Sequence, residues 1–170
     1  MPPPIRLRPA VPGDAEAVGH IWRDGWRDGH LGHVPAELVA VRTPESFLTR
    51  SAARVADTVV AVVPGDGAEE VAGFVMTADD EVEQVYVAAA HRGTAVAAAL
   101  LAGAERAVAD AGHAEAWLAV VAGNTRARRF YERNGWSDAG PLDYAAEVPG
   151  RGTLPVPTHR YTKSLTPEPP

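Results

Sequence analysis

Apolar residues in the first third of the chain follow a helical period. They recur at intervals of three and four over 18–26, which predicts one face of a helix after a short first strand at 5–8. Asp14, at the end of a Pro-Gly turn signal, is available to cap that helix. A second helical region is expected after Pro35, and Thr43 followed by Pro44 is a start signal for its later part.

The middle of the chain changes to the patterns of strands. The runs TVVAVV, EVAGFVMT and EVEQVYVA are separated by turn signals and predict three consecutive strands of an antiparallel meander. Residues 94–110 are rich in alanine and predict a helix that ends at Gly112, since glycine readily adopts a left-handed cap. The continuous apolar run AWLAVV predicts a strand buried on both faces, parallel to the strand before the helix.

The last third of the chain is less regular. A short helix is expected over 124–133, closed by Gly135. The segment 140–165 is rich in Pro and Gly, but its end, HRYTKSL, alternates as a final strand does. We therefore expect a single domain over 1–165 and a disordered tail over 166–170.

Composition narrows the classes of function. The chain has 170 residues, of which 46% are hydrophobic and 22% charged, as in a protein with one globular core. Its net charge of −6 argues against a nucleic-acid partner, which needs clustered cations. The absence of cysteine excludes a cysteine nucleophile and a thiolate metal site. Without a long apolar stretch, we expect a cytoplasmic protein that makes no membrane contact.

The segment HRGTAVAAAL, residues 91–100, lies between a predicted strand and the alanine-rich helix. A strand, turn and helix in this order direct unpaired N–H groups and a helix dipole at one place, which suits an anion. Arg92 and Thr94 add donors, and the small Ala95 and Ala97 allow a phosphate close to the backbone. The alternative is an alanine helix that simply packs tightly on a sheet.

A second segment, NTRARRFYERNGW, follows the buried strand. Asn124 and Tyr131 are two helical turns apart and lie on the same side of the expected helix. Each also has a structural interpretation, Asn124 as a helix N-cap and Tyr131 as a core aromatic. The combination of the two segments favours a ligand site.

Together these segments resemble the GNAT superfamily of acyl-CoA-dependent N-acetyltransferases. The first family motif is matched by Arg92, Ala95 and Ala97, with alanine where the family has its first glycine. The second motif is matched by Asn124, Ala127, Phe130, Tyr131, Gly135 and Trp136. The resemblance covers nearly the whole chain. It implies an α+β fold with about seven mostly antiparallel strands, splayed between the fourth and fifth, and about four helices.

The resemblance also implies a site for acetyl-CoA as co-substrate. A bulge in the fourth strand would hold the pantetheine arm and the thioester, and by position it falls on Val85, Tyr86 and Val87. Asn124 would bind the pantetheine, and Arg128 or Arg129 the nucleotide phosphate. The pyrophosphate would be held by the start of the alanine helix, at Gly93, Thr94, Ala95, Val96, Ala97 and Ala98.

Catalytic roles follow from the same resemblance. Tyr131 matches the general acid that protonates the departing thiolate, a task for which a phenol with a pKa near 10 is suitably protonated. The amine must lose a proton, and Glu83 is the first candidate for the base, with Glu81 behind it. Exposed strand polarity is the alternative for Glu83. Some family members have a glutamate on the fifth strand, where this chain has Ala119.

The sequence signals for residues that bind the acceptor amine are the least specific. Trp22, Trp26 and His30 follow at four-residue steps and could form an aromatic wall of the acceptor site, although tryptophans at this spacing are also typical of a core. His30 and His33 could titrate near pH 6.5, but no third ligand is placed for a metal, so none is expected.

The identity of the acceptor stays open at this point. The acceptor is expected to be a small-molecule or peptide amine, and exposed edge strands would allow a homodimer. A non-catalytic module of the same fold that senses acyl-CoA is the alternative to an enzyme.

Overall fold

A computed structural model of the chain describes residues 1–166, so the expected disordered tail falls almost entirely outside the described residues. Residues 1–166 form seven strands and five α-helices, together with three short 3₁₀ turns. The helices are α1 (Ala15–His30), α2 (Ala36–Val41), α3 (Pro44–Ala53), α4 (Val96–Asp110) and α5 (Thr125–Arg133). The strands are β1 (Arg6–Pro9), β2 (Thr58–Pro64), β3 (Glu69–Ala78), β4 (Glu81–Val87), β5 (Glu115–Val121), β6 (Ser137–Val148) and β7 (Gly152–Ser164).

All seven strands form one sheet in the order β1-β2-β3-β4-β5-β7-β6. Only β4 and β5 pair in parallel, and their register consists of a single pair, Glu81 with Trp117. Beyond that pair the two strands diverge, while every other neighbouring pair is antiparallel. The expected α+β fold with its splay between the fourth and fifth strands is confirmed.

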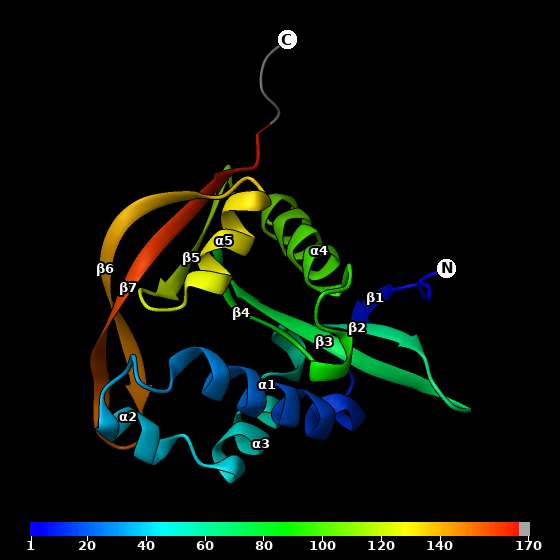
Figure 1. Ribbon diagram of the computed structural model, residues 1–170, viewed down its shortest axis with the longest axis horizontal. Coiled ribbons are helices and arrows are strands. Elements are labelled where there is room, and N and C mark those ends of the chain that lie inside the picture. The colour runs from blue at the N-terminus through cyan, green and yellow to red at the C-terminus, as the bar shows by residue number, and fades with distance from the viewer. Residues whose placement is uncertain (167–170) are drawn as a thin grey trace.

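Helices cover both faces of the sheet, with α1, α2 and α3 on one side and α4 and α5 on the other (Figure 1). Alternate residues of β2 therefore enter different cores, as the two-residue period of a strand requires. Val60 and Val62 pack with Trp22 and Phe47 of the first group of helices. Ala61 and Val63 belong to the core beneath α4. Because both faces of β2 are buried, its sequence is almost continuously apolar.

Local signals in the sequence fix several helix ends. Thr43 caps α3 by accepting a hydrogen bond from the Ser46 N–H at 3.2 Å. Gly112 takes the expected positive φ, +97°, after α4. The expectation for Asp14 needs correction, because its carboxylate makes no cap bond to α1. It reaches back instead to the Val11 N–H at 2.8 Å and pairs with Arg8 at 2.7 Å.

The last two strands form a long hairpin that the sequence pattern revealed only in part. The pattern predicts a strand over 159–165, whereas β7 begins at Gly152 and is preceded by β6. Pro155 and Pro157 obscure the strand, since proline cannot donate to a ladder. In the fold they lie beyond the segment Thr158–Ser164 that pairs with β5, so one side of the strand has no neighbour there.

Candidate active site

Two cavities meet where β4 and β5 diverge. We call the one between α4, α5 and the C-terminal half of α1 the helix-end cavity. The other, which we call the acidic cavity, lies between the strands β4 to β7 and the helices α1–α3. Their volumes are about 630 Å³ and about 520 Å³. Residues that line both are Val85, Tyr86, Asn124, Ala127 and Tyr131. The two cavities are therefore adjacent at the opening, where these residues border both.

The bulge of β4 lies earlier than the resemblance implied. Met76 pairs with Gln84 and the next residue, Thr77, pairs with Val82, so Glu83 is the extra residue in β4. The expected segment, Val85, Tyr86 and Val87, pairs regularly with β3. Its other edge faces the opening, so the backbone groups there are left free by strand divergence and not by a bulge.

The helix-end cavity contains most residues expected for the coenzyme. Val85, Tyr86, Val87, Arg92, Gly93, Thr94, Ala97 and Asn124 line it. Ala95, Val96 and Ala98 do not, since Val96 is buried in the core and the other two side chains are exposed. Their contribution could come only through the backbone.

Gly93 and Thr94 shape the turn that leads into α4. Gly93 has a φ of +75°, which glycine adopts without strain. The Thr94 hydroxyl donates to the His91 carbonyl at 2.6 Å and accepts from the Val96 N–H at 3.4 Å. The N-cap Ala95 has φ −75° and ψ 0°, a backbone that does not require glycine. Alanine at this motif position therefore introduces no backbone strain.

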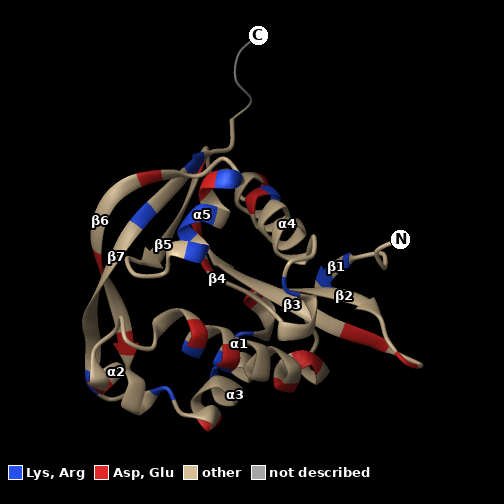
Figure 2. Ribbon diagram, viewed as in Figure 1, with Lys and Arg blue, Asp and Glu red and all other residues tan. Residues whose placement is uncertain are grey.

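Cations surround the same cavity. Arg92 lines it and forms an ion pair with Asp28 of α1 at 2.8 Å. Arg126 and Arg133 of α5 also line it, and Figure 2 shows basic residues along α5 beside the opening. Sequence reasoning missed both, because helical periodicity alone does not distinguish them from the other arginines of α5.

Arg128 has a different environment from the one expected. Its guanidinium donates to the Tyr161 hydroxyl at 3.1 Å and to the Ala122 carbonyl at 3.2 Å, and pairs with Asp138 at 3.1 Å. It lines neither cavity. These bonds tie α5 to β6 and β7, so Arg128 is not placed to bind a nucleotide phosphate, and Arg129 also lies outside the lining of both cavities.

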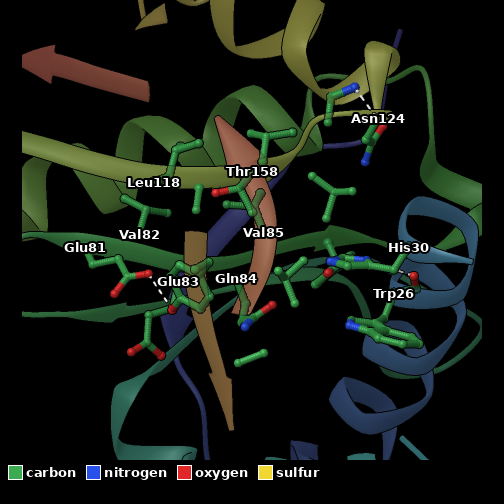
Figure 3. A pocket seen from close by; sticks show the side chains of 18 of the residues that line it. Trp26, His30, Glu81, Val82, Glu83, Gln84, Val85, Leu118, Asn124 and Thr158 are labelled. Atoms are coloured by element: carbon green, nitrogen blue, oxygen red, sulfur yellow. Dashed lines mark hydrogen bonds between the residues drawn. The ribbon is translucent and has the colours of Figure 1, made fainter. Parts of the chain in front are cut away.

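Asn124 caps α5 and also lies between the two cavities. Its side-chain oxygen accepts from the Ala127 N–H at 3.2 Å, which caps α5, and the residue lines both cavities (Figure 3). Close approach of α1 is possible because position 29 is glycine. A Cβ there would lie 2.8 Å from the Asn124 amide nitrogen.

Tyr131 lies on the boundary between the two cavities. Its ring packs against Phe130, Trp136 and Tyr161 at centroid distances of 5.2, 6.2 and 6.2 Å. Burial raises the pKa of the Tyr131 hydroxyl above its usual value. The hydroxyl is therefore protonated at neutral pH and is available as a hydrogen-bond donor.

The two glutamates of β4 both line the acidic cavity (Figure 3). Glu83 forms an ion pair with Arg54, which also pairs with Asp57 at 3.1 Å. Glu81 accepts a hydrogen bond from the Tyr144 hydroxyl at 2.7 Å. Burial raises the pKa of Glu81. Tyr144 was not expected from the sequence, because it belongs to β6, a strand that the sequence pattern did not reveal.

The aromatic residues of α1 separate into two groups. Trp22 is fully buried between Phe47 and Phe74 and lines neither cavity. Trp26 and His30 line the acidic cavity, with their rings stacked at 4.9 Å. The His30 Nδ1–H donates to the Trp26 carbonyl at 2.9 Å.

His30 does not behave as the sequence suggested. Burial lowers its pKa to about 4, so it is neutral at pH 6.5 and above. The expected titration near pH 6.5 is therefore wrong for this residue. His33 packs closely against Gly123, where a Cβ would lie 2.2 Å from the His33 ring.

Residues 1–166 contain no group of three or more His, Asp or Glu side chains arranged to hold a metal ion. None of the helices in that range is both long and apolar enough to cross a membrane.

The sequence profile of the acetyltransferase (GNAT) family matches residues 16–136. A GCN5-related N-acetyltransferase from Kribbella flavida is 25% identical, with 94% of this chain and 97% of that chain covered and a TM-score of 0.66. No curated protein sequence matches significantly.

Two similar solved structures contain a coenzyme. One is yncA from Salmonella typhimurium with its cofactor acetyl-CoA, 17% identical over 98% of this chain and 97% of that chain, with a TM-score of 0.68. The other is PaiA N-acetyltransferase from Thermoplasma acidophilum in complex with coenzyme A. It is 18% identical over 95% of this chain and 99% of that chain, with a TM-score of 0.64.

Proposed function

This chain belongs to the GNAT acetyltransferase family, and from that membership we propose that it transfers the acetyl group of acetyl-CoA to an amine by direct attack. The observation that carries the proposal is the meeting of two cavities at the opening between β4 and β5. The helix-end cavity has a helix N-terminus and several arginines, and the acidic cavity has the two glutamates of β4. The coenzyme and the amine would thus reach the opening from separate sides.

The helix-end cavity fits the coenzyme by its chemistry. The N-terminus of α4 presents backbone N–H groups and the positive end of a helix dipole, which favour a diphosphate. Arg92, Arg126 and Arg133 supply cations around the same space. Asn124 stands where the two cavities join, so its amide would meet the pantetheine arm on its way to the opening.

The reaction balances without an acyl-enzyme intermediate. The amine nitrogen attacks the thioester carbonyl carbon, and collapse of the tetrahedral species breaks the carbon–sulfur bond. The departing sulfur takes a proton from the Tyr131 hydroxyl, and the nitrogen gives its proton to a carboxylate. With a phenol of ordinary pKa near 10 and a thiol near 8.5, the proton transfer to sulfur is uphill by about 2 kcal/mol, and the raised pKa of Tyr131 adds to that cost.

Glu81 is the better candidate for the base, although Glu83 remains a candidate. The Glu83 carboxylate is already engaged in the ion pair with Arg54 and would have to leave it to meet the amine. Glu81 has no cation within ion-pair distance among residues 1–166, and its raised pKa makes it the stronger acceptor.

A thiol-release assay tests the proposed function. The protein has no cysteine, so every thiol that appears with acetyl-CoA and a panel of amines comes from the coenzyme. We expect amine-dependent release, and a Tyr131→Phe variant with turnover reduced about 100-fold and coenzyme affinity within about threefold of wild type. Unchanged turnover in this variant would remove the acid role of Tyr131. Failure of acetyl-CoA to bind wild-type protein in calorimetry would contradict the whole proposal.

A further inference from the structure

The acidic cavity also contains two arginines that lack ionic partners. Arg42, which follows α2, and Arg50, in α3, both line it. Arg42 is 8% exposed. No ion pair within residues 1–166 includes either side chain. We call these two residues the arginine pair.

Each arginine has an N–H group with no hydrogen-bond partner. Arg42 Nη2 donates to the Glu147 carbonyl at 2.8 Å, but its buried Nε has no acceptor within the described chain. Arg50 stacks over the Trp22 ring at 4.2 Å, and its buried Nη1 is likewise without an acceptor there. A buried cation with an unused donor is unfavourable in the free protein, so this arrangement favours an anionic ligand.

The electrostatic environment of the arginine pair also favours an anionic ligand. Burial lowers the pKa of Arg42, and burial together with repulsion from Arg42 lowers the pKa of Arg50 to about 10. Both remain charged at neutral pH. Tyr86, Arg54 and the exposed Glu147 are the other groups whose fields act on Arg50. An anion between the two arginines would relieve their mutual repulsion.

The arginine pair and the two glutamates of β4 occupy different parts of one cavity. The arginines come from the α2–α3 side and the glutamates from the strand next to the opening. The cavity, at about 520 Å³, is in the range that holds a small organic molecule.

We infer that the acceptor is a small amine that also carries a carboxylate, as a free amino acid does, with the carboxylate bound by Arg42 and Arg50. This assignment rests on the proposed transferase activity, because it names the acceptor of that reaction. The cationic side of the cavity holds the carboxylate, and the amine extends toward Glu81 and the thioester at the opening. The carboxylate is unchanged by the reaction and serves to position the nitrogen.

Matched acceptors test the inference without altering the protein. The standard α-amino acids and their α-amides differ only in the charge of the group that the arginine pair would bind. Polyamines and simple alkylamines complete the panel. We expect at least one amino acid to be acetylated with a kcat/KM ten- to 100-fold above that of its amide, as for loss of a charge-assisted hydrogen bond. The preference is expected mainly in KM for the acceptor.

Variants of Arg50 test whether this residue causes the preference for the amino acid over its amide. Arg50→Met keeps an apolar stem over Trp22 and removes the charge, so it should reduce the preference for the acid over its amide to within about threefold. Arg50→Lys should restore part of it, and KM for acetyl-CoA should stay unchanged in both. Arg151→Met, at an exposed position in the turn between β6 and β7, is the matched control and should retain the full preference.

The outcomes separate this inference from the proposed function. Acetylation of polyamines or amides at rates equal to or above those of every amino acid would overturn the carboxylate assignment and leave the transferase intact. A preference for acids that survives in Arg50→Met would also overturn it. If no amine releases thiol from acetyl-CoA, the proposed activity fails, and the acceptor assignment fails with it.

Discussion

Glu81 and Glu83 stand two residues apart in β4 but have different electrostatic surroundings. The bulge at Glu83 interrupts the pairing with β3, and the Glu83 side chain forms an ion pair with Arg54. Glu81 instead meets a neutral phenol, Tyr144, in a buried setting. A carboxylate without a cation holds its proton more tightly, so the two residues should contribute differently to the pH dependence of catalysis.

Paired substitutions distinguish the two glutamates. Because the base must be unprotonated, the raised pKa of Glu81 should place the acid limb of the kcat/KM profile above the ordinary glutamate value of about 4.3. Glu81→Gln should lower kcat/KM about 100-fold and abolish that limb. Glu83→Gln, the matched control, should retain the limb and lose less than about tenfold. The reverse result would assign the base to Glu83, as the sequence alone suggested.

Residues in motifs were easier to anticipate than residues outside them. Asn124 and Tyr131 lie at fixed distances along one short helix, so local periodicity brings them to one side. The arginine pair has no such signal, because Arg42 and Arg50 reach the cavity only through the packing of α2 and α3 on the sheet. The environment of Arg128 likewise depends on Asp138 of β6 and Tyr161 of β7, and Tyr161 lies far from α5 in the sequence.

At the scale of elements, the glycines of α1 set how closely this helix approaches the site. Gly25 faces the Tyr86 ring, and a Cβ there would lie 2.3 Å from Tyr86 Cδ1. Gly29, one turn on, faces Asn124. Both neighbours line the two cavities. The glycines thus allow α1 to form a wall of the opening, at the cost of lower helix propensity.

Gly25→Ala tests this packing. Alanine adds up to about 1 kcal/mol of helix propensity, but the forced movement of a ring costs about 1–3 kcal/mol. We expect a net loss of stability in urea unfolding and a weaker affinity for acetyl-CoA. Gly103→Ala in α4 is the matched control. Its Cβ would meet two flexible side-chain ends, Leu7 Cδ1 at 2.7 Å and an Arg106 Nη at 3.7 Å, so stability should be kept or slightly raised and affinity unchanged.

Elements with regular patterns were predictable from the sequence. The features that were missed all depend on how one strand pairs with another. The alanine-rich α4 and the strands β2 to β5 follow clear periods, so their existence and order agree with the sequence pattern. The hairpin of β6 and β7 contains prolines whose tolerance depends on an unpaired edge. The bulge of β4 also depends on a partner strand, and no local signal fixes its position.

At the scale of the whole molecule, the burial of His30 links stability to pH. The unfolded chain binds a proton on this residue below about pH 6.5, whereas the folded protein binds it only near pH 4. Stability from this source is complete above pH 6.5 and falls as the pH drops toward 4, by up to about 1.4 kcal/mol per pH unit. Urea unfolding between pH 4 and 7 should show this slope.

Substitution separates His30 from the other titrating groups. His30→Gln should flatten the slope, although the variant starts from a lower stability because the stacked ring is lost. The exposed His20, in the same helix, is the matched control, and His20→Gln should keep the wild-type slope. An equal slope in the His30 variant would contradict the assignment.

The divergence of β4 and β5 leaves a pair of strand edges inside the molecule. Val85 is paired on one side only, with Val75, and Val120 on one side only, with His159. A coenzyme lying there would supply the missing partners, and by mass action it would favour the folded state. Resistance to proteolysis should then rise and fall with the cellular supply of the coenzyme, so that starvation for acetyl-CoA shortens the lifetime of the enzyme as well as slowing its turnover.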